Sequence, residues 1–187
     1  MIITIDGTPG SGKNSIGEKL EKVLGYKFYS MGDLMRHMAT RKGITLVDLN
    51  RQRDKGPTID KDVDDYQREL GKEEDNFVIT GRTSYHFIPH ALKVFLKADY
   101  NVAASRIWPD LQKNERNEGN FHTEKDLENG LKKRNEGDRK RYLKYYKLDV
   151  NDSANYDFAL NTSNLDKKQV YDLVLEFVKK AGKVRVR

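Results

Sequence analysis

The chain has 187 residues, enough for one domain with a buried core, and 34% of them are charged against 36% hydrophobic. This balance excludes a disordered chain, and the formal net charge of +6 favours anionic ligands without distinguishing a nucleotide from a nucleic acid. The lack of cysteine excludes disulfides, thiolate metal sites and a cysteine nucleophile. The apolar run MIITI at the N-terminus is too short for a signal peptide or a membrane span, so we expect a cytoplasmic protein without a membrane partner.

Short apolar runs and helical periods alternate along the chain. We expect strands at residues 1–5, 26–30, 76–80, 92–98 and 156–162, because each is a short and mainly apolar run. Helices lie between them, one beginning near Pro57 and one over residues 100–109. Helix starts carry capping pairs: Ser30 with Asp33, Thr45 with Asp48, Thr123 with Asp126, and Ser163 with Asp166. This alternation predicts an α/β fold, a five-stranded parallel sheet flanked by helices, in a single domain over residues 1–187.

The segment GTPGSGKNS follows the first predicted strand and nearly matches the phosphate-loop pattern G-x-x-x-x-G-K-[ST]. Glycines let backbone N–H groups turn toward one anion, the start of the next helix adds its partial positive charge, and Lys13 would reach the outer phosphates. The position after the lysine, which usually carries a hydroxyl for magnesium, is Asn14, and the hydroxyl comes one residue later at Ser15. We expect the nucleotide phosphates to bind along the whole loop: Gly7, Thr8, Pro9, Gly10, Ser11, Gly12, Lys13, Asn14 and Ser15.

Arginines are spaced along the rest of the chain in a way that favours a small kinase, which holds its acceptor with arginines and closes an arginine-bearing lid over the phosphates. The guanine-reading pattern N-K-x-D, which a GTPase needs, is absent. Residues 110–122 are polar and lack an apolar period, which predicts a mobile lid at about 110–125. For each arginine the alternative to a role in the site is a solvated charge on the surface. The candidates are Arg36, Arg82, Arg106, Arg116, Arg134, Arg139 and Arg141.

Several segments together resemble the nucleoside monophosphate kinases, specifically the short cytidylate kinases of archaea and related bacterial forms. The similarity runs through GTPGSGK, YSMGDLMR, PTIDKDVDDYQ, FVITGR, FIPHALKVFLKAD, RNEGDRKRY and NYDFALNTS, which cover nearly the whole chain. It implies a P-loop kinase fold with a monophosphate-binding region at about 30–75. It also implies transfer of the γ-phosphoryl group of ATP to CMP or dCMP, with Mg²⁺.

The resemblance also implies roles for single residues. Arg36 and Arg82 match arginines that grip the acceptor's phosphate. The segment RNEGDRKR matches an R-x-x-x-D-x-x-R pattern, in which Arg134 and Arg141 contact phosphates at the centre of transfer and Asp138 contacts the acceptor sugar. Arg106, on the helix before the lid, joins the catalytic set.

Three aspartates complete this picture. Asp60 and Asp64 lie one helical turn apart on one face and resemble acceptor-side aspartates that accept from the cytosine amino group, with a solvated acidic face as the alternative. Asp33 resembles an aspartate that orients magnesium waters.

Two positions depart from the family pattern. Asn14 replaces the magnesium hydroxyl, and Thr80 stands where related kinases often carry Asp or Glu. An amide oxygen is still a suitable magnesium ligand, so we expect Asn14 to bind the metal or a metal-bound water. Because Ser15 is rotated by about 100° from Asn14 around the helix, we expect its hydroxyl to point away. Asp6, at the end of the first strand, could partly supply the charge missing at Thr80.

Other functions stay open at this point. The chain could phosphorylate AMP or UMP, or it could bind nucleotide after losing catalysis, as the two departures allow. An RNA-binding function through the basic residues, including the C-terminal KVRVR, is opposed by the interleaved acidic residues and by the lack of an aromatic stacking motif. We expect a monomer whose partners are ATP and a nucleoside monophosphate, and no nucleic acid.

Overall fold

Five parallel strands form the centre of this computed structural model, which describes residues 1–56, 58–113 and 115–182. The strand order is β2-β3-β1-β4-β5, so the first strand lies in the middle of the sheet. The five predicted strands are therefore confirmed: β1 Ile3–Gly7, β2 Lys27–Ser30, β3 Phe77–Gly81, β4 Leu92–Lys97 and β5 Phe158–Asn161.

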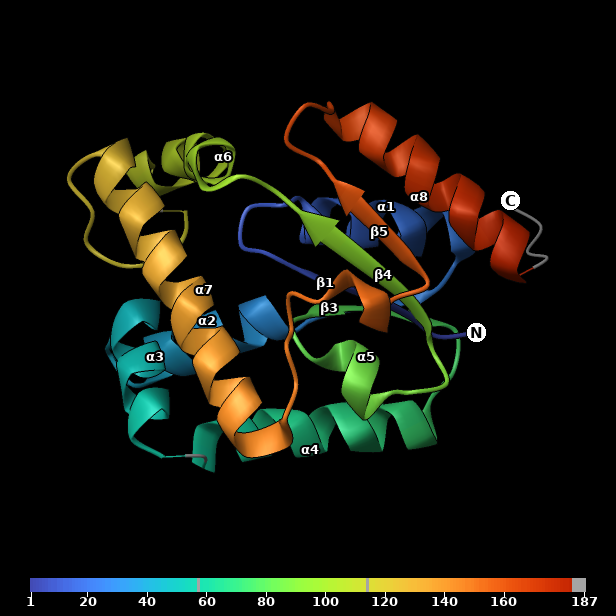
Figure 1. The fold of residues 1–187 in the computed structure, drawn as a ribbon, viewed down its shortest axis with the longest axis horizontal. Helices are drawn as coiled ribbons and strands as arrows, with labels where there is room; N and C mark the ends of the chain where they lie inside the picture. Colours follow the sequence, from blue (N-terminus) through green and yellow to red (C-terminus); the bar gives the residue numbers. More distant parts are fainter. Residues whose placement is uncertain (57, 114, 183–187) are drawn as a thin grey trace.

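Helices cover both faces of the sheet (Figure 1). On one face, α1 (Lys13–Leu24) and α8 (Lys167–Gly182) pack against a buried cluster that includes Ile3, Leu20 and Val174. On the other face, a second cluster includes Met35, Leu49 and Phe77. The helices on that side are α2 Met31–Arg41, α3 Leu46–Lys55, α4 Thr58–Glu73 and the short α5 Ser84–Phe87.

Two further helices stand beyond the ends toward which the strand arrows point, as Figure 1 shows. They are α6 (Tyr100–Gln112) and α7 (Glu124–Tyr146), and they share a small apolar cluster that includes Leu127 and Leu131. The helix predicted at 100–109 therefore continues through Pro109 to Gln112. A short 3-10 helix, Ser153–Asn155, precedes β5.

The capping predictions are confirmed in part. Thr45 with Asp48 and Thr123 with Asp126 form reciprocal capping boxes. Ser30 caps α2 by accepting from the Asp33 amide, but the Asp33 carboxylate turns to Asn14 and Arg36 instead of closing the box.

Of the capping pair predicted for α8, Asp166 caps the helix but Ser163 does not. Asp166 itself accepts from the amides of Lys168 and Gln169, while the Ser163 hydroxyl donates to Asn161. No helix among the described residues is long and apolar enough to span a membrane. Pro57 and the C-terminal KVRVR lie outside the described residues.

Candidate nucleotide-binding and phosphoryl-transfer site

The loop between β1 and α1 has a backbone that only glycine tolerates at two positions. Gly7 has φ of 143°, and a Cβ there would lie 1.9 Å from the Leu96 carbonyl oxygen. Gly10 has φ of 70°, and its Cβ would lie 2.7 Å from Ala103 Cα. The loop therefore packs closely against β4 and α6, and α1 begins at Lys13 with its amide end toward the pocket. This is the strand–loop–helix context that a phosphate loop requires.

Lys13 is held by the loop itself. Its Nζ donates to the carbonyl oxygens of Gly7 at 3.0 Å and Thr8 at 2.6 Å. Burial lowers the pKa of Lys13 well below its usual range, and the nearby charges of Arg82 and Arg134 lower it further. A phosphate group in this space would relieve that repulsion, so the ammonium is placed to bind an anion.

Asn14 occupies the centre of a small polar network. Its Oδ1 accepts from the Thr80 hydroxyl at 2.9 Å, and its Nδ2 donates to Ser30 Oγ at 3.0 Å and to Asp33 Oδ2 at 2.8 Å. The two departures from the family pattern, Asn14 and Thr80, are thus hydrogen-bonded to each other. Ser15 lines the pocket with the rest of the loop.

Asp6 lies outside the pocket lining, although its charge acts on Lys13. Its strand pairs beside β3 as expected, with Asp6 opposite Gly81. However, its carboxylate is fully buried and accepts from the amides of Ser84 and Tyr85, both at 3.0 Å. Burial raises the pKa of Asp6 to about 6 despite these hydrogen bonds. The residue therefore anchors the start of α5.

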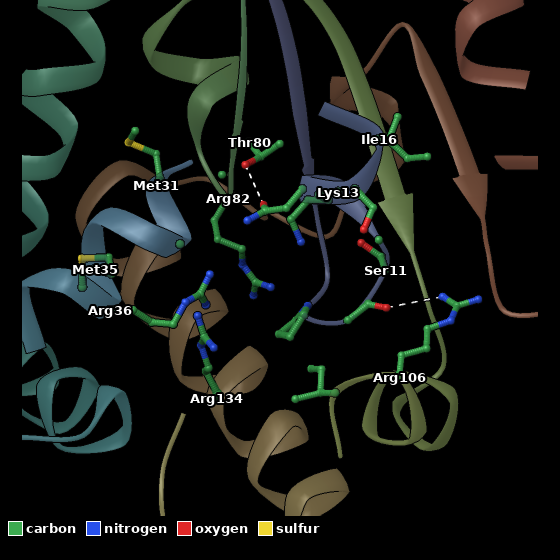
Figure 2. Close-up of a pocket in the computed structure, with 18 of the residues that line it drawn as sticks. Ser11, Lys13, Ile16, Met31, Met35, Arg36, Thr80, Arg82, Arg106 and Arg134 are labelled. Carbon is green, nitrogen blue, oxygen red and sulfur yellow. Dashed lines mark hydrogen bonds between the residues drawn. The ribbon is translucent and has the colours of Figure 1, made fainter. Parts of the chain in front are cut away.

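Three arginines from different elements converge opposite Lys13. Figure 2 shows Arg36 from α2, Arg82 after β3 and Arg134 from α7 with their guanidinium groups directed toward one space. Arg82 donates to the Gly7 carbonyl at 3.1 Å and pairs with Asp138 at 3.2 Å, which ties it to both the loop and α7. All three line a pocket of about 290 Å³ together with the loop residues Pro9 to Ser15.

A buried glutamate contacts two of these arginines. Glu118, in the segment between α6 and α7, accepts from Arg36 at 3.3 Å, from Arg134 at 2.9 Å and from Arg116 at 2.7 Å. Only 3% of Glu118 is exposed. Nothing in the sequence marked this residue, because it is one acidic residue in a polar segment and its partners lie far away in the chain.

The R-x-x-x-D-x-x-R segment is brought together, but its members face different ways. Asp138 pairs with Arg82 and Arg141, and these charges lower its pKa although burial acts in the opposite direction. Arg141 also pairs with Asp60 Oδ2 at 2.7 Å and, among the described residues, stands outside the pocket lining. Arg134 and Asp138 line the pocket, so the pattern divides into two pocket residues and one buried anchor, Arg141.

Asp60 and Asp64 also lie behind the pocket wall. Asp60 is 1% exposed and is clamped between Arg141 and Arg53, the latter from α3. Asp64 accepts from the Tyr146 hydroxyl at 2.6 Å, and burial raises its pKa to about 7. The residues that do face the pocket here are Arg53, Val63, Gln67 and Tyr142.

Arg53 is the site residue that the sequence analysis missed. It is 6% exposed, donates to Tyr142 at 3.0 Å and to Asn50 at 2.8 Å, and pairs with Asp60. A signal was present: Arg53 follows Leu49 by four residues and Leu46 by seven, so it falls on the buried face of its helix.

The remaining candidates lie at the edge of the site. Arg106 donates to the carbonyl oxygens of Thr162 at 2.7 Å and Gly10 at 3.4 Å, so it links α6 to the loop. Figure 2 shows it apart from the other labelled arginines. Arg116 lines the pocket, whereas the exposed Arg139 pairs with Asp149 at 2.6 Å.

A phosphate loop opposite convergent arginines, on a parallel sheet in this order, defines the protein as a P-loop kinase. The model of the cytidylate kinase-like family matches residues 2–164, and the chain belongs to this family.

Relatives and solved structures agree with this assignment. The chain is 35% identical to a cytidylate kinase of Methanothrix thermoacetophila, over 96% of this chain and 98% of the relative. It is also 35% identical to a cytidylate kinase of Archaeoglobus fulgidus, over 95% and 94% of the two chains. A solved shikimate kinase from Bacteroides thetaiotaomicron superposes with a TM-score of 0.60 at 15% identity, covering 98% of this chain and 99% of that one. This last likeness concerns the fold alone.

Proposed function

We propose that the protein transfers the γ-phosphoryl group of ATP to the phosphate of CMP or dCMP, giving a nucleoside diphosphate and ADP. The observation that carries this proposal is the pocket in which Lys13 and the loop amides face Arg36, Arg82 and Arg134. The relatives named cytidylate kinase support a cytosine nucleotide as the acceptor.

The donor binds to the loop. Lys13 exchanges the carbonyl oxygens of Gly7 and Thr8 for the outer phosphates, and the first amides of α1 face the same oxygens. Arg36 and Arg82 hold the acceptor's phosphate, whose oxygen is already anionic and needs no general base. That oxygen forms a bond to the γ-phosphorus, the bond from the γ-phosphorus to the bridging oxygen breaks, and ADP leaves with the electron pair. Arg134 offsets the charge that develops between them.

The acceptor's base lies deeper, against Val63, Gln67 and Tyr142. Asp60 contributes by orienting Arg53, and Asp64 lies behind Gln67, whose Nε2 donates to it at 3.4 Å. The cytosine edge therefore meets Arg53 and Gln67, and the two aspartates act through them. Asp138 lines the pocket and also positions Arg82, whereas Arg141 acts on Arg82 only through Asp138.

Magnesium fits this site as an ion that arrives with ATP. The described residues contain no group of three or more acidic or imidazole side chains that could hold a metal alone. Asp33 has 57% of its side chain exposed beside Asn14, which suits contact with metal-bound water, and Asn14 and Ser15 offer further oxygens. When bound, the ion neutralises phosphate charge. We also propose that residues from about 110 to 125 form the lid, with Arg116 as its pocket arginine.

The test is a coupled ADP-release assay with a panel of nucleoside monophosphates and deoxynucleoside monophosphates, with and without Mg²⁺. We expect CMP and dCMP to give the largest kcat/KM and release to require Mg²⁺. A preference for AMP or UMP would show that the base assignment is wrong. ATP binding without release for any acceptor would instead support a nucleotide-binding protein without catalysis.

A further inference from the structure

Two of the arginines assigned to phosphates, Arg36 and Arg134, are already paired with an anion of the protein itself. Glu118 offers both carboxylate oxygens: Oε1 accepts from Arg36 and Arg116, and Oε2 accepts from Arg134 at 2.9 Å. The three arginines come from α2, from the segment between α6 and α7, and from α7. Carboxylate and phosphate oxygens use the same bidentate contacts with guanidinium groups.

The same three arginines line the pocket with Lys13 and Arg82, so the carboxylate competes for donors that a bound phosphate also needs. Burial raises the pKa of Glu118, but the charges of Arg134, Arg116 and Arg36 lower it more, so Glu118 is ionised at neutral pH. A second anion cannot join the same arginines without repulsion from this charge.

The backbone around Glu118 rests on the acceptor side of the molecule. The Glu118 carbonyl accepts from the Val47 amide at 3.1 Å, and Asn117 donates to the Ile44 carbonyl at 3.2 Å. Gly119 packs so closely on Val47 that a Cβ would lie 2.7 Å from its Cγ2. Asn117 also donates to the Thr40 hydroxyl of α2, so the segment is docked on α2, α3 and the turn between them, and the carboxylate is the part of it that reaches the arginines.

We propose that Glu118 is an internal competitor of the acceptor's phosphate: its carboxylate satisfies Arg36, Arg116 and Arg134 in the nucleotide-free protein, and the monophosphate displaces it. This inference rests on the proposed function, which assigns Arg36 and Arg134 to phosphates. It makes Glu118 a positioning residue whose charge sets the affinity for the acceptor and discriminates against weak anions. If instead Glu118 stayed in place and aligned the arginines around the phosphate, removing its charge would have the opposite effect on affinity.

The test compares CMP and cytidine binding by isothermal titration calorimetry in wild type, Glu118→Gln and Glu115→Gln. Glu115 is an exposed acidic residue of the same segment, so its variant controls for the change in net charge. If the empty state is about nine-tenths occupied by Glu118, the competing state lowers CMP affinity about tenfold. We expect Glu118→Gln to lower the Kd for CMP by roughly that factor and to leave the Kd for cytidine unchanged. Glu115→Gln should stay within about twofold of wild type.

Weaker or unchanged CMP binding in a folded Glu118→Gln variant would overturn the proposal, and so would equal tightening of cytidine. Glu118→Asp keeps the charge and should show no tightening. Thermal unfolding adds a readout for a destabilised variant: the melting temperature of Glu118→Gln should be lower without ligand and should rise more on CMP addition than that of wild type. In turnover, the KM for CMP should fall while the KM for ATP stays constant. The two proposals can fail separately, because the binding measurement needs no turnover. Wild type that binds CMP but releases no ADP would contradict the proposed function, and the Glu118 variants would still test this inference.

Discussion

The donor side of the pocket is one run of residues, Pro9 to Ser15, whereas the acceptor side takes side chains from α2, α3, α4 and α7. In the proposed function the donor side binds mainly through backbone amides, which glycine geometry fixes, and Lys13 adds one charge. The acceptor side depends on guanidinium groups held by buried carboxylates, such as Arg53 by Asp60 and Arg82 by Asp138. Mutations on the donor side should therefore lower activity without lowering stability, whereas mutations on the acceptor side should lower both.

Lys13→Ala should give the largest loss. It removes the ammonium that faces the outer phosphates, so we expect kcat to fall on the order of 10³-fold, about 4 kcal/mol of transition-state stabilisation. The melting temperature should change little, because burial disfavours the charged ammonium in the empty protein. The ADP-release assay and thermal unfolding measure the two effects, with Lys22→Ala on the exposed face of α1 as the control. Near-normal turnover would contradict the kinase assignment.

Asp60→Asn tests whether the buried ion pairs of the acceptor side stabilise the fold. The change leaves the buried guanidinium groups of Arg53 and Arg141 without one of their carboxylate partners. We expect the free energy of unfolding, measured in urea, to fall by about 3 kcal/mol. A loss of activity without a loss of stability would show that Asp60 contacts the base directly, as the sequence first suggested.

Arg36→Ala distinguishes the acceptor side from the donor side through the KM values of the two substrates. We expect the KM for CMP to rise about thirtyfold, roughly 2 kcal/mol, while the KM for ATP changes by less than about threefold. Lysine should rescue only part of the loss because it lacks the planar fork. Arg41→Ala, exposed at the end of the same helix, is the matched control. Equal increases in both KM values would place Arg36 on the donor side.

Asp64→Asn should affect stability rather than phosphate binding, with a distinct pH dependence. Burial raises the pKa of Asp64 to about 7, so between about pH 4 and 7 the folded protein keeps a proton that the unfolded chain loses. Stability from this group is therefore complete in acid and is lost as the pH rises toward 7. We expect Asp64→Asn to gain about 1–3 kcal/mol relative to wild type between pH 5 and pH 8, measured by urea unfolding. The exposed Asp62→Asn should gain nothing over that range.

The sequence predicted the strand–loop–helix unit of the donor side because the information is local: Gly7, Gly10 and Lys13 lie within seven consecutive residues. It also predicted the five strands, since each is a short apolar run. It could not predict which carboxylate meets which arginine, because Arg53 finds Asp60 and Tyr142 only after three helices pack together. The aspartates at 60 and 64 were expected at the base, whereas the structure buries them behind Arg53 and Gln67. Glu118 gave no local signal at all.

The hydrogen bond between Thr80 and Asn14 has a consequence for how this sequence could have evolved. An amide has one accepting end and one donating end, and here the accepting oxygen meets the Thr80 hydroxyl while the donating nitrogen meets the Asp33 carboxylate. With Asp or Glu at position 80, a carboxylate would lie on each side, and neither orientation of the amide could satisfy both. A carboxylate at position 80 is therefore penalised while Asn14 is present, whereas a hydroxyl at position 14 could both accept from Thr80 and donate to Asp33. An acidic residue at position 80 should therefore be tolerated only after Asn14 has been replaced by serine or threonine.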